Sequence, residues 1–174
     1  VAVGVGGTIL TSSDGINWTP RSSGTSVSLD CIDYGLDTFV VAGQNGTILA
    51  SPDGINWTPQ SSGTTNSLQD ITYASNIFVA VGDSGTILTS PDGITWAPRS
   101  SGTTNALYGI TYSNGTFVAV GLFGTILTSP NGIIWTSRSS GTTNSLKNIT
   151  YASNIFVAVG VGGTILTSSD GINW

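Results

Sequence analysis

One short stretch recurs five times in this chain at a constant distance. The copies occupy residues 12–18, 51–57, 90–96, 129–135 and 168–174. Each begins with Ser and ends with Trp, and successive copies start 39 residues apart, without insertion or deletion. A repeat this regular predicts an array of one supersecondary unit, in which each unit covers the apolar faces of its neighbours.

The recurring stretch has the chemistry of a tight turn. In the copy at 90–96, Pro91 presets φ, Asp92 can accept hydrogen bonds from the backbone amides that follow it, and Gly93 tolerates positive φ. Trp96 brings an apolar ring and one N–H. We therefore expect structural turns, each capped by a side chain and held by an indole, with Trp57, Trp96 and Trp135 mostly buried between neighbouring sheets. The capping positions are Asp14, Asp53, Asp92, Asn131 and Asp170.

One repeat unit predicts four short strands and essentially no helix. The expected strands are 68–73, 78–81, 86–89 and a fourth that covers 94–96 and a few residues more. Turn residues separate them, as in an antiparallel meander. The second strand is apolar at consecutive positions, which indicates a sheet covered on both faces.

The turn motif resembles the Asp-box, Ser-x-Asp-x-Gly-x-x-Trp, of BNR-like β-propellers in the sialidase-like and photosystem II assembly-factor-like families. The match is one residue shorter between Asp and Gly, and Asn131 replaces Asp in the fourth copy. The resemblance implies an all-β propeller whose Asp-boxes are structural and lie far from any site. It does not carry sialidase activity to this chain, because Arg21, Arg99 and Arg138 share one repeat column and should diverge.

The fold prediction is one β-propeller domain, or a propeller fragment, over residues 1–174, built from 39-residue blades. Residues 1–20 supply a partial blade of three strands, and complete blades are expected at 28–62, 67–101, 106–140 and 145–174, which makes nineteen strands. A five-bladed ring, a fragment of a larger ring and closure between chains remain open. The chain has no Met, and residues 1–18 are identical to 157–174, which we interpret as a piece of a longer array or a product cut from one.

Composition argues against several functions. The chain has no His and no Glu, so we expect no enzyme, no cofactor and no metal site. Its net charge is −5 with four Lys and Arg residues, which disfavours nucleic acid as a partner. No apolar run is long enough for a membrane span. The single cysteine, Cys31, is expected to be a small, partly buried residue.

Variation among the copies suggests a binding face. The second residue of the first strand is Asp30, Gln69, Tyr108 or Lys147, and the residue after it is Cys31, Asp70, Gly109 or Asn148. The turn after the second strand also varies, and there we select Gln44, Asn45, Asp83, Ser84, Leu122 and Phe123. In a propeller both regions lie at one rim of the central channel. The alternative is that exposed loops vary in sequence without any function. The turn between the first two strands, at the other end of the sheet, varies as well.

Two functions follow as hypotheses. The first is a binding module that presents its channel rim, with Tyr108 and Phe123 as a joint aromatic surface, to a glycan, a peptide or a protein. The second is a structural or assembly repeat of a larger exported or cell-surface protein, which could associate with itself through uncovered blades. The low content of charged residues, 7%, suits an extracellular, cell-surface or periplasmic protein.

Overall fold

The computed structural model describes all 174 residues, and they form eighteen strands in five antiparallel sheets. In each sheet the strands follow chain order, and the sheets have three, four, four, four and three strands. The first strands of the repeat are β4 (Leu29–Gly35), β8 (Leu68–Ala74), β12 (Leu107–Ser113) and β16 (Leu146–Ala152). The second strands are β1 (Ala2–Gly4), β5 (Thr38–Gly43), β9 (Ile77–Gly82), β13 (Thr116–Gly121) and β17 (Ile155–Gly160). The third strands are β2 (Thr8–Thr11), β6 (Ile48–Ser51), β10 (Ile87–Ser90), β14 (Ile126–Ser129) and β18 (Ile165–Ser168). The fourth strands are β3 (Thr19–Arg21), β7 (Thr58–Gln60), β11 (Ala97–Arg99) and β15 (Thr136–Arg138).

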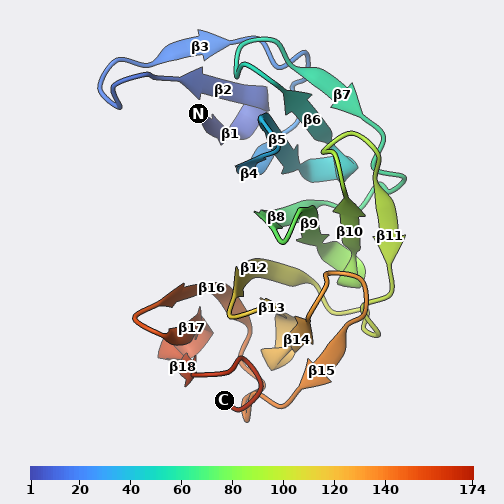
Figure 1. Cartoon of the computed structure of the whole chain (residues 1–174), viewed down its shortest axis with the longest axis vertical. Coiled ribbons are helices and arrows are strands. Elements are labelled where there is room, and N and C mark those ends of the chain that lie inside the picture. The colour runs from blue at the N-terminus through green and yellow to red at the C-terminus, as the bar shows by residue number, and fades with distance from the viewer.

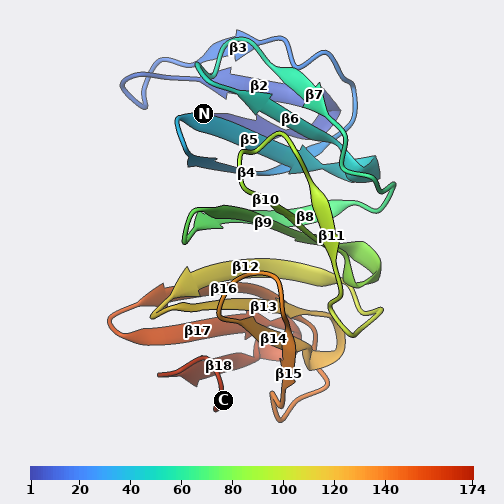
Figure 2. The same ribbon diagram turned by 45° about the vertical axis from the view of Figure 1, so that its right-hand side comes forward.

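The sheets stack face to face along an open arc (Figure 1). The first strands β4, β8 and β12 lie towards the concave side, and the fourth strands β7, β11 and β15 lie on the outside. Turning the molecule shows the sheets as successive layers (Figure 2). This is the all-β blade architecture that the repeat predicts, with the first and last sheets separated by a gap rather than closed into a ring.

The fourth strand begins later than the sequence suggested. We expected it at 94–96, yet β11 starts at Ala97, because the amides of Ile94 and Thr95 donate to Asp92 Oδ1 at 2.9 and 2.7 Å instead of pairing in the sheet. The residues equivalent to β11 in the last unit would follow Trp174. The sheet within 145–174 therefore has three strands rather than four, and the total is eighteen rather than nineteen.

The turns between second and third strands are single turns of 3-10 helix. They are η1 (Val5–Gly7), η2 (Gln44–Gly46), η3 (Asp83–Gly85), η4 (Leu122–Gly124) and η5 (Val161–Gly163). Each has a residue with positive φ at its centre. No helix of this structure has the length and apolar character that a membrane crossing needs.

The core lies between neighbouring sheets. Phe78, Val79, Ala80 and Val81 of β9 are all completely buried, which confirms that the second strand is covered on both faces. The last sheet has one uncovered face. There Ile165 is 67% exposed, whereas its equivalent Ile126 is 0% exposed. Burial of each sheet thus depends on the next one in the array, as expected for a repeat protein.

The recurring turns have the hydrogen bonds that a capped turn requires. Besides the amides of Ile94 and Thr95, Asp92 Oδ1 accepts a bond from Ser90 Oγ at 2.9 Å, and Trp96 Nε1 donates to the carbonyl of Gly93 at 3.3 Å. Asn131 accepts the same two amide bonds in its copy. The bonds to backbone amides lower the pKa of Asp92 below its usual value. Trp57, Trp96 and Trp135 are largely buried against the apolar core, as expected, whereas Trp18 in the first, partial unit is 44% exposed.

Candidate functional site

A β-bulge sets the position of the variable residue in each first strand. In β8, Leu68 pairs with Gly82 and Asp70 pairs with Val81, so Gln69 between them has no partner across the sheet. The same register shift occurs in β4, β12 and β16. The bulged residues are therefore Asp30, Gln69, Tyr108 and Lys147. A bulge turns its side chain away from the regular pleat, and bulges are common beside functional sites.

The bulged residues lie next to the 3-10 turns. The carbonyl of Ser67, just before β8, accepts a bond from the amide of Asp83 in η3 at 2.9 Å, and β8 also contacts η2 of the preceding sheet. We use the name inner rim for the four bulged residues together with Gln44, Asn45, Asp83, Ser84, Leu122 and Phe123. Apart from the bulged residues, the inner rim consists of residues in η2, η3 and η4.

Part of the inner rim is acidic and internally bonded. Gln69 Nε2 donates to Asp83 Oδ1 at 3.1 Å within one sheet. Burial and the nearby charge of Asp83 raise the pKa of Asp30, which belongs to the preceding sheet. Three residues of the predicted set thus come together across two blades.

A second part of the inner rim is aromatic and cationic. The ammonium nitrogen of Lys147 lies 3.9 Å from the centroid of the Tyr108 ring. This distance is well within the range of a cation–π interaction, which joins β12 to β16. Tyr108 is half-buried and Lys147 is exposed, so a ligand can reach this pair.

The remaining members of the predicted set are less uniform. Gln44, Asn45, Ser84 and Asn148 are exposed, and Leu122 is half-buried. The rings of Tyr108 and Phe123 do not contact each other as an aromatic pair, and their joint surface stays a prediction. Phe123 borders a cavity beside η4.

The carboxylate of Asp70 is occupied by hydrogen bonds to the backbone rather than free to bind a ligand. Its two carboxylate oxygens accept bonds from the amide of Ile71 at 2.9 Å and from the amide of Ile110, on the neighbouring β12, at 2.8 Å. Burial is the main reason that the pKa of Asp70 rises to about 6, with a further contribution from Asp33, while the two amide bonds oppose the rise. Asp70 therefore ties two first strands together.

Asp33 and Cys31 complete this cluster, and Asp33 was not among the predicted residues. Asp33 Oδ2 accepts a bond from the amide of Tyr73 at 2.6 Å and joins β4 to β8. The sequence did contain a signal for Asp33, because its column also varies between repeats and holds Thr72 in the next one. Cys31 is 8% exposed, more buried than expected, and burial raises the pKa of its thiol.

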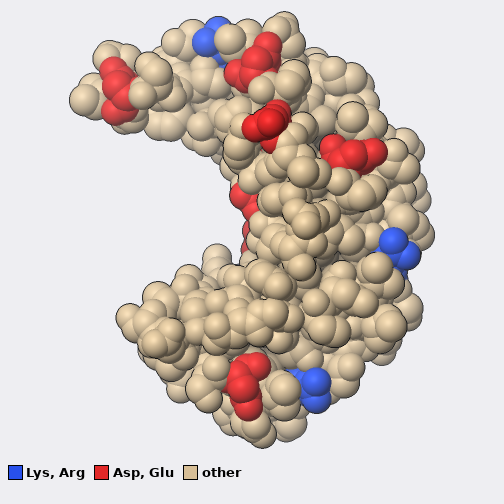
Figure 3. All heavy atoms as spheres, in the orientation of Figure 1, with Lys and Arg blue, Asp and Glu red and all other residues tan.

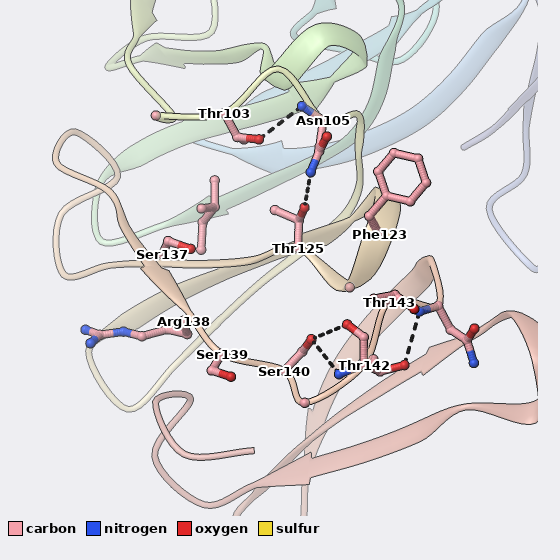
Figure 4. A pocket seen from close by; sticks show the side chains of 15 residues that line it. Thr103, Asn105, Phe123, Thr125, Ser137, Arg138, Ser139, Ser140, Thr142 and Thr143 are labelled. Carbon is pink, nitrogen blue, oxygen red and sulfur yellow. Dashed lines mark hydrogen bonds between the residues drawn. The ribbon is translucent and has the colours of Figure 1, made fainter.

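A cavity lies between two of the loops that connect one sheet to the next. It has a volume of about 810 Å³, and 15 residues line it. Phe123 and Arg138 lie at opposite sides of it, with Ser140 and Thr142 along its lower edge (Figure 4). Sequence reasoning missed this cavity because most of its lining comes from columns that hardly vary between repeats.

Charge is distributed unevenly around the arc. Figure 3 shows acidic side chains at the concave edge and also over the facing surface of the arc, while the basic side chains visible in this view lie only towards the outer side. Arg138 is held there by a bond of 2.8 Å from its Nε to Thr128 Oγ1, and Arg21 and Arg99 make equivalent bonds. The arginines are thus spread along the outer strands, as their common column predicts.

The structural comparisons identify the fold as that of β-propellers. The chain superposes on a structure described as YCF48 bound to D1 peptide with a TM-score of 0.74 and 20% identity, over 99% of this chain and 60% of that one. It superposes on the WD40 β-propeller domain of Doa1 with a TM-score of 0.69 and 14% identity, over 95% of this chain and 62% of that one.

A third similar structure is the computationally designed Ika4 protein, with a TM-score of 0.67, 15% identity and coverage of 81% of this chain and 90% of that one. The chain therefore spans about three fifths of the YCF48 and Doa1 chains. No family model matches the sequence, and no curated protein matches it.

Proposed function

We propose that this chain is a non-catalytic binding module whose inner rim takes a segment of a protein or peptide. The main support is the coincidence of the most variable repeat position with a β-bulge that carries its side chain out of the sheet pattern, at Asp30, Gln69, Tyr108 and Lys147. A fixed frame with differing side chains at one edge suits a surface that recognises a partner. The neighbouring structure of YCF48 with the D1 peptide supports peptide binding as a use of this fold.

The chemistry of the inner rim is suited to noncovalent recognition. Asp30 and Asp83 can accept hydrogen bonds from a cationic or amide group, and the Tyr108–Lys147 pair can pack against an apolar or aromatic side chain. We propose the absence of catalysis on the residue types alone, since the chain has neither His nor Glu. The Asp-box family assignment and the exported setting also stay proposals, which rest on the turn sequence and on composition respectively.

The test is selection of binders from a displayed random-peptide library on the purified chain, followed by calorimetry with the selected peptides. Tyr108→Ala and Asp83→Ala should weaken binding at least tenfold, while thermal stability stays within about 1 kcal/mol, as is usual for surface positions. Ile94→Ser is the matched control, since Ile94 is 55% exposed on a capped turn at the other end of the sheet. Peptides that lose affinity with Ile94→Ser and not with the rim variants would contradict the proposal.

A second function is favoured by the uncovered face of the last sheet. Val159 and Ile165 are 41% and 67% exposed, although their equivalents Val120 and Ile126 are completely buried against a neighbouring sheet. Such a face suits a structural repeat that stacks on another sheet of the same kind. Light scattering of the 174-residue chain checks this: Ile165→Lys should convert any oligomer to monomer, and a monomeric parent chain would count against it.

A further inference from the structure

The cavity beside Phe123 is one of three equivalent cavities in neighbouring repeats. The other two lie beside η3 and η2, with volumes of about 600 and 730 Å³. All three are lined by a 3-10 turn, the end of a fourth strand and the Ser-Ser-Gly-Thr-Thr loop that follows it. The residue at the centre of the turn is what distinguishes them: Asn45, Ser84 or Phe123.

Phe123 is poorly explained by folding alone. Its φ is 54°, a left-handed conformation that is uncommon for a bulky residue, and the same position in η1 and η5 is Gly. Its side chain is 63% exposed, so it gains little burial in return for the backbone strain. Leu36 combines positive φ with 50% exposure as well, but it lies in the β4–β5 turn at the other end of the sheet. Residues held in such conformations tend to mark functional positions.

The lining of this cavity indicates the chemistry of a ligand. Only 2 of its 15 residues are hydrophobic, and the others are mainly Ser, Thr, Asn and Gly, with Arg138 and without any carboxylate. Hydroxyl and amide groups can both donate and accept hydrogen bonds. A ligand that matches carries many hydroxyl groups and one apolar face that an aromatic ring can cover. Peptides match less well, since Phe123 is the single aromatic ring of the lining and its other hydrophobic residue, Leu127, is almost completely buried.

We propose that the cavity between η4 and the loop 139–144 is a saccharide-binding site, in which Phe123 stacks on the apolar face of a sugar ring. Ser140 and Thr142 use their hydroxyl groups for bonds within the loop. The hydroxyl groups of Ser139 and Thr143, together with the guanidinium of Arg138 at the opposite side, bind the hydroxyl or carboxylate substituents of the sugar (Figure 4). The volume of about 810 Å³ lies within the usual range of small-molecule sites. The site shares Phe123 with the inner rim but includes neither Tyr108 nor Lys147, so Tyr108→Ala distinguishes it from the function proposed for the inner rim.

The experiment uses the purified chain on an array of neutral and uronic-acid oligosaccharides, with titration calorimetry on the best glycan. Phe123→Ser reproduces the turn of the neighbouring repeat and should lower affinity at least tenfold. Ser84→Phe places the ring beside the equivalent cavity, which has Arg99 in its lining, and should raise the stoichiometry from one to two. Arg138→Gln should reduce binding of uronic acids more than binding of neutral sugars, while Tyr108→Ala should change neither.

Two outcomes would overturn the proposal. The first is an array on which the parent chain binds no glycan better than Phe123→Ser does. The second is a thermal midpoint of Phe123→Ser clearly below that of the parent, because it would identify Phe123 as a packing residue, whereas removal of a strained exposed ring should leave the midpoint equal or higher. Peptides that depend on Phe123 while no sugar binds would assign the cavity to the rim function instead.

Discussion

Replacement of Asp70 by Asn should change stability in opposite directions at low and neutral pH. Asp70 accepts two amide bonds between β8 and β12, but it is half-buried and its pKa is raised from 3.8 to about 6. An acid whose pKa is higher in the folded state binds its proton more tightly there. Stability linked to Asp70 is therefore fully present below pH 3.8 and is lost as the pH rises through about 6.

The magnitude follows from the size of the shift. A rise of roughly two pKa units corresponds to about 3 kcal/mol of unfolding free energy lost between pH 4 and pH 7. Asn removes this charge, but its amide oxygen replaces only one of the two carboxylate acceptors, which costs about 1 kcal/mol for the bond to Ile71 or Ile110. Asp70→Asn should therefore stabilise the fold by about 1–2 kcal/mol at pH 7 and destabilise it by about 1 kcal/mol at pH 4.

Urea unfolding followed by tryptophan fluorescence at pH 4, 5, 6 and 7 measures this difference. Asp92→Asn is the control with the opposite trend, because bonds from the amides of Thr95 and Ile94 lower the pKa of Asp92. Stability linked to Asp92 is present above its unfolded pKa and is lost as the pH falls. If Asp70→Asn changes the unfolding free energy equally at pH 4 and pH 7, the ionised carboxylate is not the unfavourable group and the reasoning is wrong.

The same unfolding assay tests three further changes. Asp92→Ala should cost about 1–2 kcal/mol through loss of the cap, and no change would contradict its role in the turn. Trp96→Ala should cost about 2–3 kcal/mol, less than for a fully buried tryptophan, and a cost near zero would remove it from the core beside Phe78, whose ring centroid is 6.4 Å away. Gly124→Ala should lower the free energy of unfolding much more than Gly141→Ala does. Both glycines have φ of 69°, but a Cβ at Gly124 would lie 2.1 Å from the carbonyl oxygen of Thr142 and one at Gly141 meets nothing within 4 Å, so equal costs would refute the steric argument.

The repeat made the architecture predictable from sequence. Its spacing fixed the unit, and the consecutive apolar residues of the second strand indicated a sheet covered on both sides, as Phe78 to Val81 show. The capped turn was equally readable, because Pro, Asp and Gly each have a defined effect on local backbone conformation. These features depend on residues close together in the chain, or on a pattern repeated without change.

The predictions from sequence failed where a side chain competes with the sheet for hydrogen bonds from backbone amides. The fourth strand starts three residues late because the Asp92 carboxylate occupies the amides of Ile94 and Thr95. Asp33 and Asp70 bind amides 40 residues ahead on neighbouring strands. No local pattern specifies which distant amide a carboxylate will meet, so these links between blades had to come from the structure.

The β-bulge explains why variation was a useful guide to the inner rim and a poor guide to the cavity. Gln69 and its equivalents have no partner across the sheet, so the fold tolerates any side chain there, and their differences are visible in the sequence. The cavity is lined by loop residues that also hold the repeats together, such as Ser140, whose hydroxyl bonds to the carbonyl of Thr142 at 3.1 Å. Such residues must stay constant whether or not they bind a ligand. Only a residue that departs from its column against a steric cost, as Phe123 does, makes a site of this kind visible.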